Sequence, residues 1–213
     1  MLKKLASGIS AGILIGIGGC VYLGCVGNRY VGAILFSVAL LCICYKGYAL
    51  FTGKVGFIPE DHGKDAIITL ILALIGNTIG AVGTGLIVHY TVPKYGIYAY
   101  WLCDGKLDNQ KFWQTFVLAI FCGILMYLAV SIFRDHKTPL GVLFCIPTFI
   151  LAGFEHSIAD LFYFSAGEYF RLKSLLYLFL VVLGNAVGGM LLPLLSGVWN
   201  RRKGKQTDKG EKQ

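Results

Sequence analysis

Six long stretches of apolar residues divide the 213-residue chain. They cover roughly residues 6–27, 31–51, 66–92, 112–133, 139–164 and 174–199. A helix needs about 20 apolar residues to cross the hydrocarbon core of a bilayer, and each stretch meets that length. Hydrophobic residues make up 56% of the chain and charged residues only 14%, so a soluble fold could not cover this apolar surface. We predict an all-α membrane protein with six transmembrane helices.

Lysine and arginine residues predict the orientation of these helices, because they are enriched in cytoplasmic segments. If the N-terminus is inside, the inner segments hold twelve such residues and the outer segments six, with Lys46 left inside a span. We therefore expect a multi-pass protein of the cell (inner or plasma) membrane with both termini in the cytoplasm. Residues 1–200 would form one transmembrane domain. Residues 201–213 would form a basic tail near anionic lipid rather than a nucleic-acid-binding segment.

A short motif occurs twice, about half a chain apart. Residues 74–81 read Leu-Ile-Gly-Asn-Thr-Ile-Gly-Ala, and residues 182–189 read Val-Leu-Gly-Asn-Ala-Val-Gly-Gly. Each copy lies in the third span of a three-span half, and an odd number of spans inserts the two halves in opposite orientations. This pattern predicts an inverted repeat over about 6–92 and 112–199, as in many channels and transporters. The glycine pairs alone would also permit close helix packing.

The second span of each half contains small, polar or charged residues where a helix would otherwise continue. Span two is interrupted at Leu-Phe-Thr-Gly (50–53), and span five at Gly-Phe-Glu-His-Ser (153–157). Non-helical backbone is tolerated at membrane depth only where it is buried in protein or lines a cavity. We therefore expect broken second and fifth helices, with the functional site between the two breaks.

The seven cysteines and four histidines show no metal-ligand spacing. Six of the cysteines lie inside apolar stretches, where a thiol behaves as a small hydrophobe. We expect neither a metal site nor another cofactor.

The two Gly-Asn motifs, the Phe-Thr-Gly segment at 51–53 and above all Gly-Phe-Glu-His-Ser-Ile-Ala-Asp at 153–160 resemble the formate/nitrite transporter family. The similarity runs from about Gly8 to about Trp199. It implies an aquaporin-like six-helix protomer and a homopentamer with one pore in each protomer. Members of the family pass formate, nitrite, hydrosulfide or related small monovalent species.

The resemblance also implies site residues, position by position. The substrate pathway would contain His156, Thr52, Glu155, Lys106 and Asn185. The apolar constrictions would be formed by Phe36, Leu40, Leu50, Phe51 and Phe149.

Two positions depart from the family pattern. Span four carries Cys122-Gly123-Ile124 where an asparagine is usual. The vestibule lysine matches Lys106 only after a shift of one residue, because the ungapped match is Leu107.

These residue types suit the passage of a weak acid. Burying an isolated charge costs many kcal/mol, so an anion crosses more easily once it is protonated. His156 titrates nearest physiological pH and would donate a proton or a hydrogen bond, and Thr52 can both donate and accept. Lys106 in an outer vestibule would attract anions.

Structural alternatives stay open at several of these positions. Lys106 would be a solvated loop lysine, Asp160 a structural or capping residue, and Lys46 a side chain that extends to the inner headgroups. The asparagines of the two Gly-Asn motifs would only hold the backbone of the broken helices.

The leading functional hypothesis is a channel or proton-coupled transporter for formate or nitrite. Hydrosulfide or another small weak acid is an alternative for the same fold. A neutral-solute pore of the aquaporin kind is a second class, but the chain lacks an Asn-Pro-Ala loop and an arginine within a span. A membrane enzyme is a third class, and Glu155, His156 and Asp160 form no recognisable catalytic set. We predict a transporter and not an enzyme.

Overall fold

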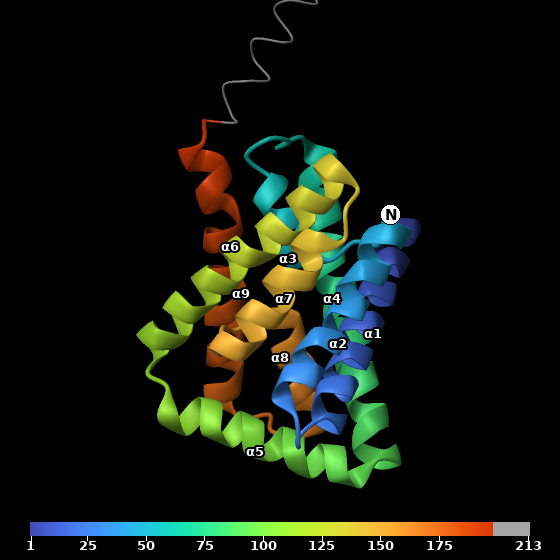
Figure 1. Cartoon of the computed structure of the whole chain (residues 1–213), viewed down its shortest axis with the longest axis vertical. Coiled ribbons are helices and arrows are strands. Elements are labelled where there is room, and N and C mark those ends of the chain that lie inside the picture. Colours follow the sequence, from blue (N-terminus) through green and yellow to red (C-terminus); the bar gives the residue numbers. More distant parts are fainter. Residues whose placement is uncertain (198–213) are drawn as a thin grey trace, which may run out of the picture.

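The computed structural model describes residues 1–197, which form a bundle of helices with no strand among them (Figure 1). The helices long and apolar enough to cross a membrane are α1 (Leu2–Gly24), α2 (Arg29–Lys46), α4 (Lys64–Thr91), α6 (Phe112–His136) and α9 (Leu172–Leu195). A sixth span consists of α7 (Leu140–Ala152) and α8 (Ser157–Ala166), which are bent by 55° at a short break. The prediction of six transmembrane helices is confirmed. The predicted basic tail at 201–213 lies outside the described residues.

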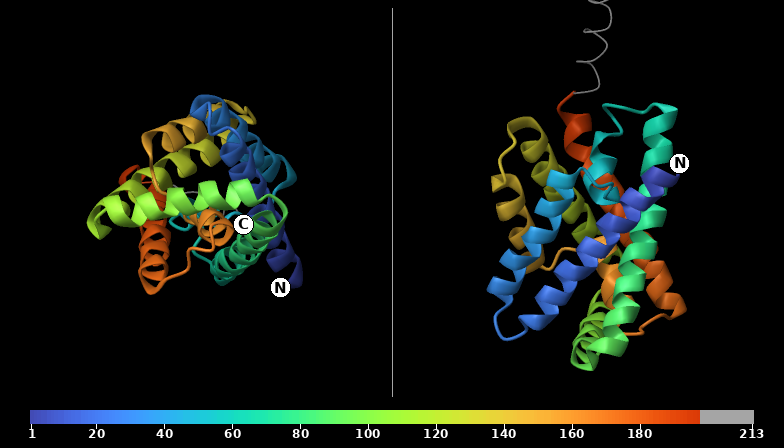
Figure 2. Two further views of the ribbon diagram at one scale, coloured as in Figure 1. Left: turned by 90° about the horizontal axis from the view of Figure 1, so that it is seen from below. Right: turned by 90° about the vertical axis from the view of Figure 1, so that its right-hand side faces the viewer.

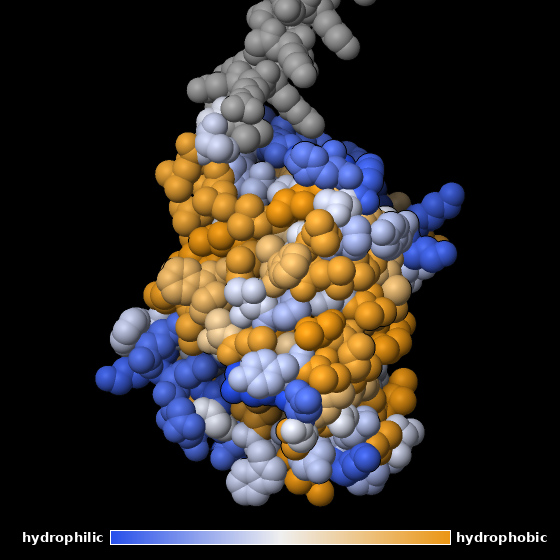
Figure 3. All heavy atoms as spheres, in the orientation of Figure 1, coloured by the Kyte–Doolittle hydropathy of each residue, from blue (hydrophilic) through white to orange (hydrophobic). Residues whose placement is uncertain are grey.

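Apolar side chains cover the middle of the molecule. On the face seen in Figure 3, a hydrophobic band separates more hydrophilic residues at the two ends. Large apolar side chains such as Leu35, Ile71, Phe144 and Phe179 are exposed on the spans. Lipid or another protein subunit therefore has to cover this surface in place of water.

The two halves pack their first and third spans in the same way, α1 against α4 and α6 against α9. A Cβ added to Gly12 would lie 2.3 Å from the carbonyl oxygen of Asn77, and one added to Gly123 would lie 2.4 Å from that of Asn185. Backbone therefore meets backbone at equivalent places in the two halves. The same contact explains the departure at Gly123, since no side chain fits there in this arrangement.

A helix that the sequence analysis missed connects the two halves. α5 (Pro93–Asn109) lies across the end of the bundle opposite the N-terminus (Figures 1 and 2). Ala99, Cys103 and Leu107 recur at the spacing of one helix face and are buried, so packing stabilises a helix there. The expectation that Lys106 lies in a loop is therefore wrong.

The two breaks have the same construction. α2 is followed by Gly47 and α7 by Gly153, with φ angles of 68° and 74°. Glycine adopts this left-handed conformation readily, which ends each helix. After the first break come α3 (Phe51–Lys54) and the short 3-10 helix η1 (Val55–Phe57), and after the second comes α8.

The break in the second span lies earlier than predicted. The non-helical residues are 47–50, whereas Phe51, Thr52 and Gly53 begin the next helix. The reason is that the chain leaves the helical conformation at Gly47 rather than near Gly53. Lys46, the last residue of α2, is exposed just before this break.

One asparagine holds the first break from the neighbouring third span. Oδ1 of Asn77 accepts a hydrogen bond from the N–H of Phe51 at 2.7 Å, and Nδ2 donates to the carbonyl oxygens of Gly8 and Ala49, both at 2.8 Å. Asn77 is fully buried. These bonds satisfy backbone groups that lipid could not.

Asn185 makes the equivalent contacts in the second half. Its Oδ1 accepts from the N–H of Ser157 at 2.9 Å, and its Nδ2 donates to the carbonyl oxygens of Ala119 and Glu155, both at 2.8 Å. The spacing is the same in the two breaks. Asn77 binds the carbonyl of Ala49 and the N–H of Phe51, and Asn185 binds the carbonyl of Glu155 and the N–H of Ser157. The predicted repeat of three plus three spans, with broken second and fifth helices, is confirmed.

We predict that Asn77→Leu and Asn185→Leu destabilise the protein to a similar degree. Leucine has a similar size but strands three buried backbone groups, each at a cost of about 1–3 kcal/mol. Thermal unfolding of the detergent-solubilised protein measures the effect. Thr78→Val is the matched control, because Thr78 only bonds back to Leu74 of its own helix. If either leucine variant melted like the wild type, its asparagine would not hold the break.

Candidate functional site

Thr52 and His156 come from opposite halves and meet in the interior. Thr52 is the second residue of α3, and His156 immediately precedes α8. Their side-chain atoms Oγ1 and Nε2 lie 2.9 Å apart, and both residues are buried. The two breaks therefore converge on one polar pair, as expected from the sequence.

The hydrogen bonds of His156 define which ring nitrogen carries the proton. The backbone N–H of Ala159 donates to Nδ1 at 3.1 Å and caps α8. Because a backbone N–H can only donate, Nδ1 is unprotonated, and Nε2 of the neutral ring carries the proton. Nε2 then donates to Thr52 Oγ1, which leaves the hydroxyl proton of Thr52 available for another acceptor.

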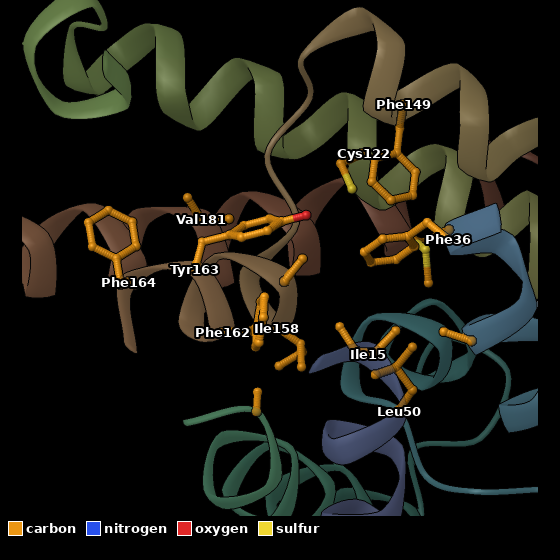
Figure 4. Packing of buried hydrophobic residues seen from close by; sticks show 14 of the residues in the cluster. Ile15, Phe36, Leu50, Cys122, Phe149, Ile158, Phe162, Tyr163, Phe164 and Val181 are labelled. Atoms are coloured by element: carbon orange, nitrogen blue, oxygen red, sulfur yellow. The ribbon is translucent and has the colours of Figure 1, made fainter. Parts of the chain in front are cut away.

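Apolar side chains surround this polar pair. The ring of Phe149 stacks on the His156 ring, with centroids 5.6 Å apart and an angle of 13° between planes. Figure 4 shows Phe36 and Phe149 close together, extending from α2 and α7. Leu40 and Leu50 are also buried. Leu50 is the residue immediately before α3, and His156 is the residue immediately before α8. The position of the histidine in the second half is therefore occupied by a leucine in the first half.

A cavity of about 310 Å³ opens on the α5 side of the pair. Phe36, Phe149 and His156 form part of its wall, together with the charged residues Arg29, Lys106 and Asp160. We call this space the outer cavity.

A second cavity, of about 370 Å³, lies on the other side of the pair. Leu40 and Leu50 line it, and Lys54, Arg134 and Lys137 add three positive charges. We call this space the inner cavity. The two cavities share no lining residue. Phe36, Phe149 and His156 end the outer cavity and Leu40 and Leu50 end the inner cavity, so these residues lie between the two spaces. Phe51 is buried next to Thr52 but lines neither cavity.

Lys106 contacts two carboxylates at the outer cavity. Its Nζ forms an ion pair with Glu155 Oε2 and lies 3.2 Å from Asp160 Oδ1. Gln110 Nε2 donates to the other oxygen of Glu155 at 2.9 Å. The Lys106 side chain is only 15% exposed, so the solvated-lysine alternative is wrong. Lys106, the residue of the match shifted by one position, is the one that contacts Glu155.

The charge of Lys106 is fixed by its neighbours. Burial by itself lowers the pKa of Lys106, but the carboxylates of Asp160 and Glu155 outweigh it and raise the pKa well above its ordinary value. The ammonium group therefore stays charged.

Asn185 lines neither cavity. All of its hydrogen bonds are with backbone groups of the break and of Ala119, which is the structural role that the sequence left open. It belongs to the site as the residue that positions the backbone on either side of His156.

Arg29 is a residue of the outer cavity that the sequence analysis did not select. Its guanidinium donates to the carbonyl oxygen of Leu151 at 2.8 Å, in the last turn of α7. No carboxylate of the described residues forms an ion pair with it. A single arginine between two spans carries no signal that would have placed it at a cavity.

Residues 1–197 contain no group of three or more His, Cys, Asp or Glu side chains arranged to hold a metal ion.

Comparison with known proteins finds similarity to one family over nearly the whole chain. The family model described as "Formate/nitrite transporter" matches residues 1–199. A formate-nitrite transporter of Plasmodium ovale is 32% identical over 197 residues, which cover 76% of this chain and 63% of that protein. The formate-nitrite transporter of Plasmodium falciparum (isolate 3D7) is 27% identical over 90% of this chain and 75% of its own length. Several of these relatives are longer, and the chain spans about 63% of the first.

Solved structures share the fold. A "Pentameric formate channel with formate bound" superimposes with a TM-score of 0.74 at 24% identity, over 93% of this chain and 95% of that one. An "FNT family ion channel" gives a TM-score of 0.78 at 22% identity, over 90% and 87%. The match to the family model and the broken-helix architecture together show that the chain is a multi-pass membrane protein of the formate/nitrite transporter family.

Proposed function

We propose that the chain carries a small monovalent anion, formate or nitrite, across the cell membrane in company with a proton. The observation that carries this proposal is a pair of cavities from opposite ends of the protomer, separated by the Thr52–His156 pair and an apolar collar. Family membership and the names of the relatives support the same substrate class. The pentameric formate channel of the same fold supports a homopentamer with one pathway in each protomer.

Passage as the neutral acid follows from the chemistry of the constriction. Phe36, Phe149, Leu40 and Leu50 offer no ligands to replace the hydration of an anion, so a bare charge would be costly there. His156 assists by donating from Nε2 to Thr52, whose hydroxyl then donates to an oxygen of the substrate. The resulting chain of two hydrogen bonds lets a polar acid cross between the rings.

The positive-inside rule supports an orientation with α5 outside. The N-terminus and the described end of α9 lie at the end opposite α5 (Figure 1). The inner cavity carries Lys54, Arg134 and Lys137, in keeping with cationic cytoplasmic segments. Both termini would then be cytoplasmic, and Lys106 would face the outer solution through the outer cavity.

Hydrosulfide is the alternative substrate within the same mechanism, because it is also the anion of a small weak acid. A neutral-solute pore is the alternative from another class. Proteoliposomes that contain the purified protein would be tested with formate, nitrite, hydrosulfide and glycerol across a range of pH. We expect anion uptake that rises as the outer pH falls. Glycerol flux without any anion flux would contradict the proposal.

We predict that His156→Ala leaves the pentamer assembled but lowers formate uptake by about tenfold, the value expected for one hydrogen bond of about 1.4 kcal/mol. Thr52→Val should have a similar effect, since it breaks the same relay. Thr52→Ser is the matched control, because it keeps the hydroxyl and should retain most of the uptake. Wild-type uptake by His156→Ala at every pH would exclude the histidine from the pathway.

We assign the attraction of anions to Arg29 rather than to Lys106. The carboxylate of Glu155 offsets the charge of Lys106, whereas Arg29 forms no ion pair in the described chain. Arg29→Gln should therefore raise the apparent KM for formate about fivefold at low salt, as for a loss of about 1 kcal/mol, and much less at high salt.

Two variants control for the loss of structure in this test. Arg29→Lys keeps the charge and should keep the wild-type salt dependence. Lys94→Gln removes a cation from the other end of α5, away from the outer cavity, and should change nothing. A salt dependence unaltered by Arg29→Gln would remove Arg29 from anion capture.

A further inference from the structure

Two carboxylates share one cation beside the outer cavity. One ammonium group, that of Lys106, lies between the carboxylates of Glu155 and Asp160. The two carboxylate side chains are 1% and 2% exposed. Because both carboxylates share this one ammonium group in a buried site, the second negative charge would have no cation of its own, and this favours the protonated form of one of them.

The hydrogen bonds identify which carboxylate is charged. Both oxygens of Glu155 are occupied by donors, Lys106 at Oε2 and Gln110 at Oε1. Asp160 shares Lys106 through Oδ1 only, while its Oδ2 is buried and has no hydrogen-bond partner among residues 1–197. Glu155 is therefore the better site for the negative charge, and Asp160 Oδ2 is the atom that can carry a proton.

The other titratable and charged groups around the site leave this balance unchanged. They are Tyr22 on α1, Arg29 on α2, Cys103 on α5, Cys122 on α6, His156 in the break, Tyr163 on α8 and Tyr177 on α9. Thiols, phenols and a neutral imidazole add no charge near neutral pH. Arg29 is bonded to the carbonyl of Leu151 and forms no ion pair with Asp160.

We propose that Asp160 holds a proton on Oδ2 and transfers it to the anion in the outer cavity. This inference rests on the proposed function and identifies the proton source of the pathway. Asp160 lines the cavity together with His156. The neutral ring of His156 carries one proton, on Nε2, and uses it in the hydrogen bond to Thr52 Oγ1, while Nδ1 accepts from the N–H of Ala159.

The step needs only a proton from the outer solution as a further reactant. The O–H bond at Asp160 Oδ2 breaks, and an O–H bond forms on the formate or nitrite anion. A neutral acid then leaves towards the constriction, and the Asp160 carboxylate remains beside the ammonium of Lys106. A proton from the outer solution restores the Asp160 carboxyl group, and the acid releases its own proton in the inner solution.

Infrared difference spectroscopy of the reconstituted protein tests the inference without relying on transport. We expect the C=O stretching band of a buried carboxylic acid in the wild type at neutral pH. Asp160→Asn should abolish this band, and Asp160→Glu, which keeps a titratable group, should restore it. Asp108→Asn is the matched control, since Asp108 lies on the outer side but is 67% exposed, and it should leave the band unchanged.

Absence of the band in the wild type, or its persistence in Asp160→Asn, would overturn the assignment. Formate uptake by the same samples then separates the two proposals. Asp160→Asn should still assemble, as judged by size-exclusion chromatography, and take up formate about tenfold more slowly with little dependence on outer pH. If the band behaves as expected but the wild type carries no anion, the proposed function fails while the protonated site stands.

Discussion

A broken helix inside a membrane leaves backbone N–H and C=O groups with no water to bind them, and the protein must supply every partner. Asn77 and Asn185 meet this requirement with one amide for each break. Because each asparagine extends from the third span of its own half, it also positions the chain after the break. Because the segments at both breaks are held in this way, Thr52 and His156 meet in the interior.

The scaffold is symmetric, whereas its side chains are not. Ala49 and Glu155 supply the equivalent carbonyl groups to the two asparagines, yet only Glu155 carries a charge. Leu50 occupies the place in the first half that His156 occupies in the second. The second break therefore contributes the titratable groups and the first contributes a hydroxyl and apolar bulk. The carboxylates of Glu155 and Asp160 lie on the outer side of the constriction. The charged residues that line the inner cavity are cations, of which Arg134 forms ion pairs with Glu60 and Asp135.

The spans and the presence of two breaks could be predicted from sequence, because they follow from hydrophobic length and from small and polar residues in the second span of each half, whereas Thr52 and His156 were selected through the family resemblance. The exact position of the first break could not, since it depends on the left-handed conformation of Gly47. The helix α5 was missed because it does not span the membrane, although the spacing of Ala99, Cys103 and Leu107 contains its signal.

The charges at the outer cavity were the least predictable part. Lys106, Glu155 and Asp160 are far apart along the chain or on different helix faces, and only the packing of α5 against α8 brings them together. The same holds for Arg29, which reaches the cavity from the start of α2. The sequence shows that such charged residues exist, but not which of them form ion pairs. Whether a lysine attracts anions or stabilises a carboxylate depends on these ion pairs.

We propose that each anion crosses the constriction as its neutral acid. Formate flux through proteoliposomes, with the membrane potential clamped by potassium and valinomycin, tests this proposal. We expect the flux to follow the gradients of formate and proton and to stay the same when the imposed potential changes. A flux that grows with the potential at constant pH would mean that the charged anion itself crosses, and would rule out passage as the neutral acid.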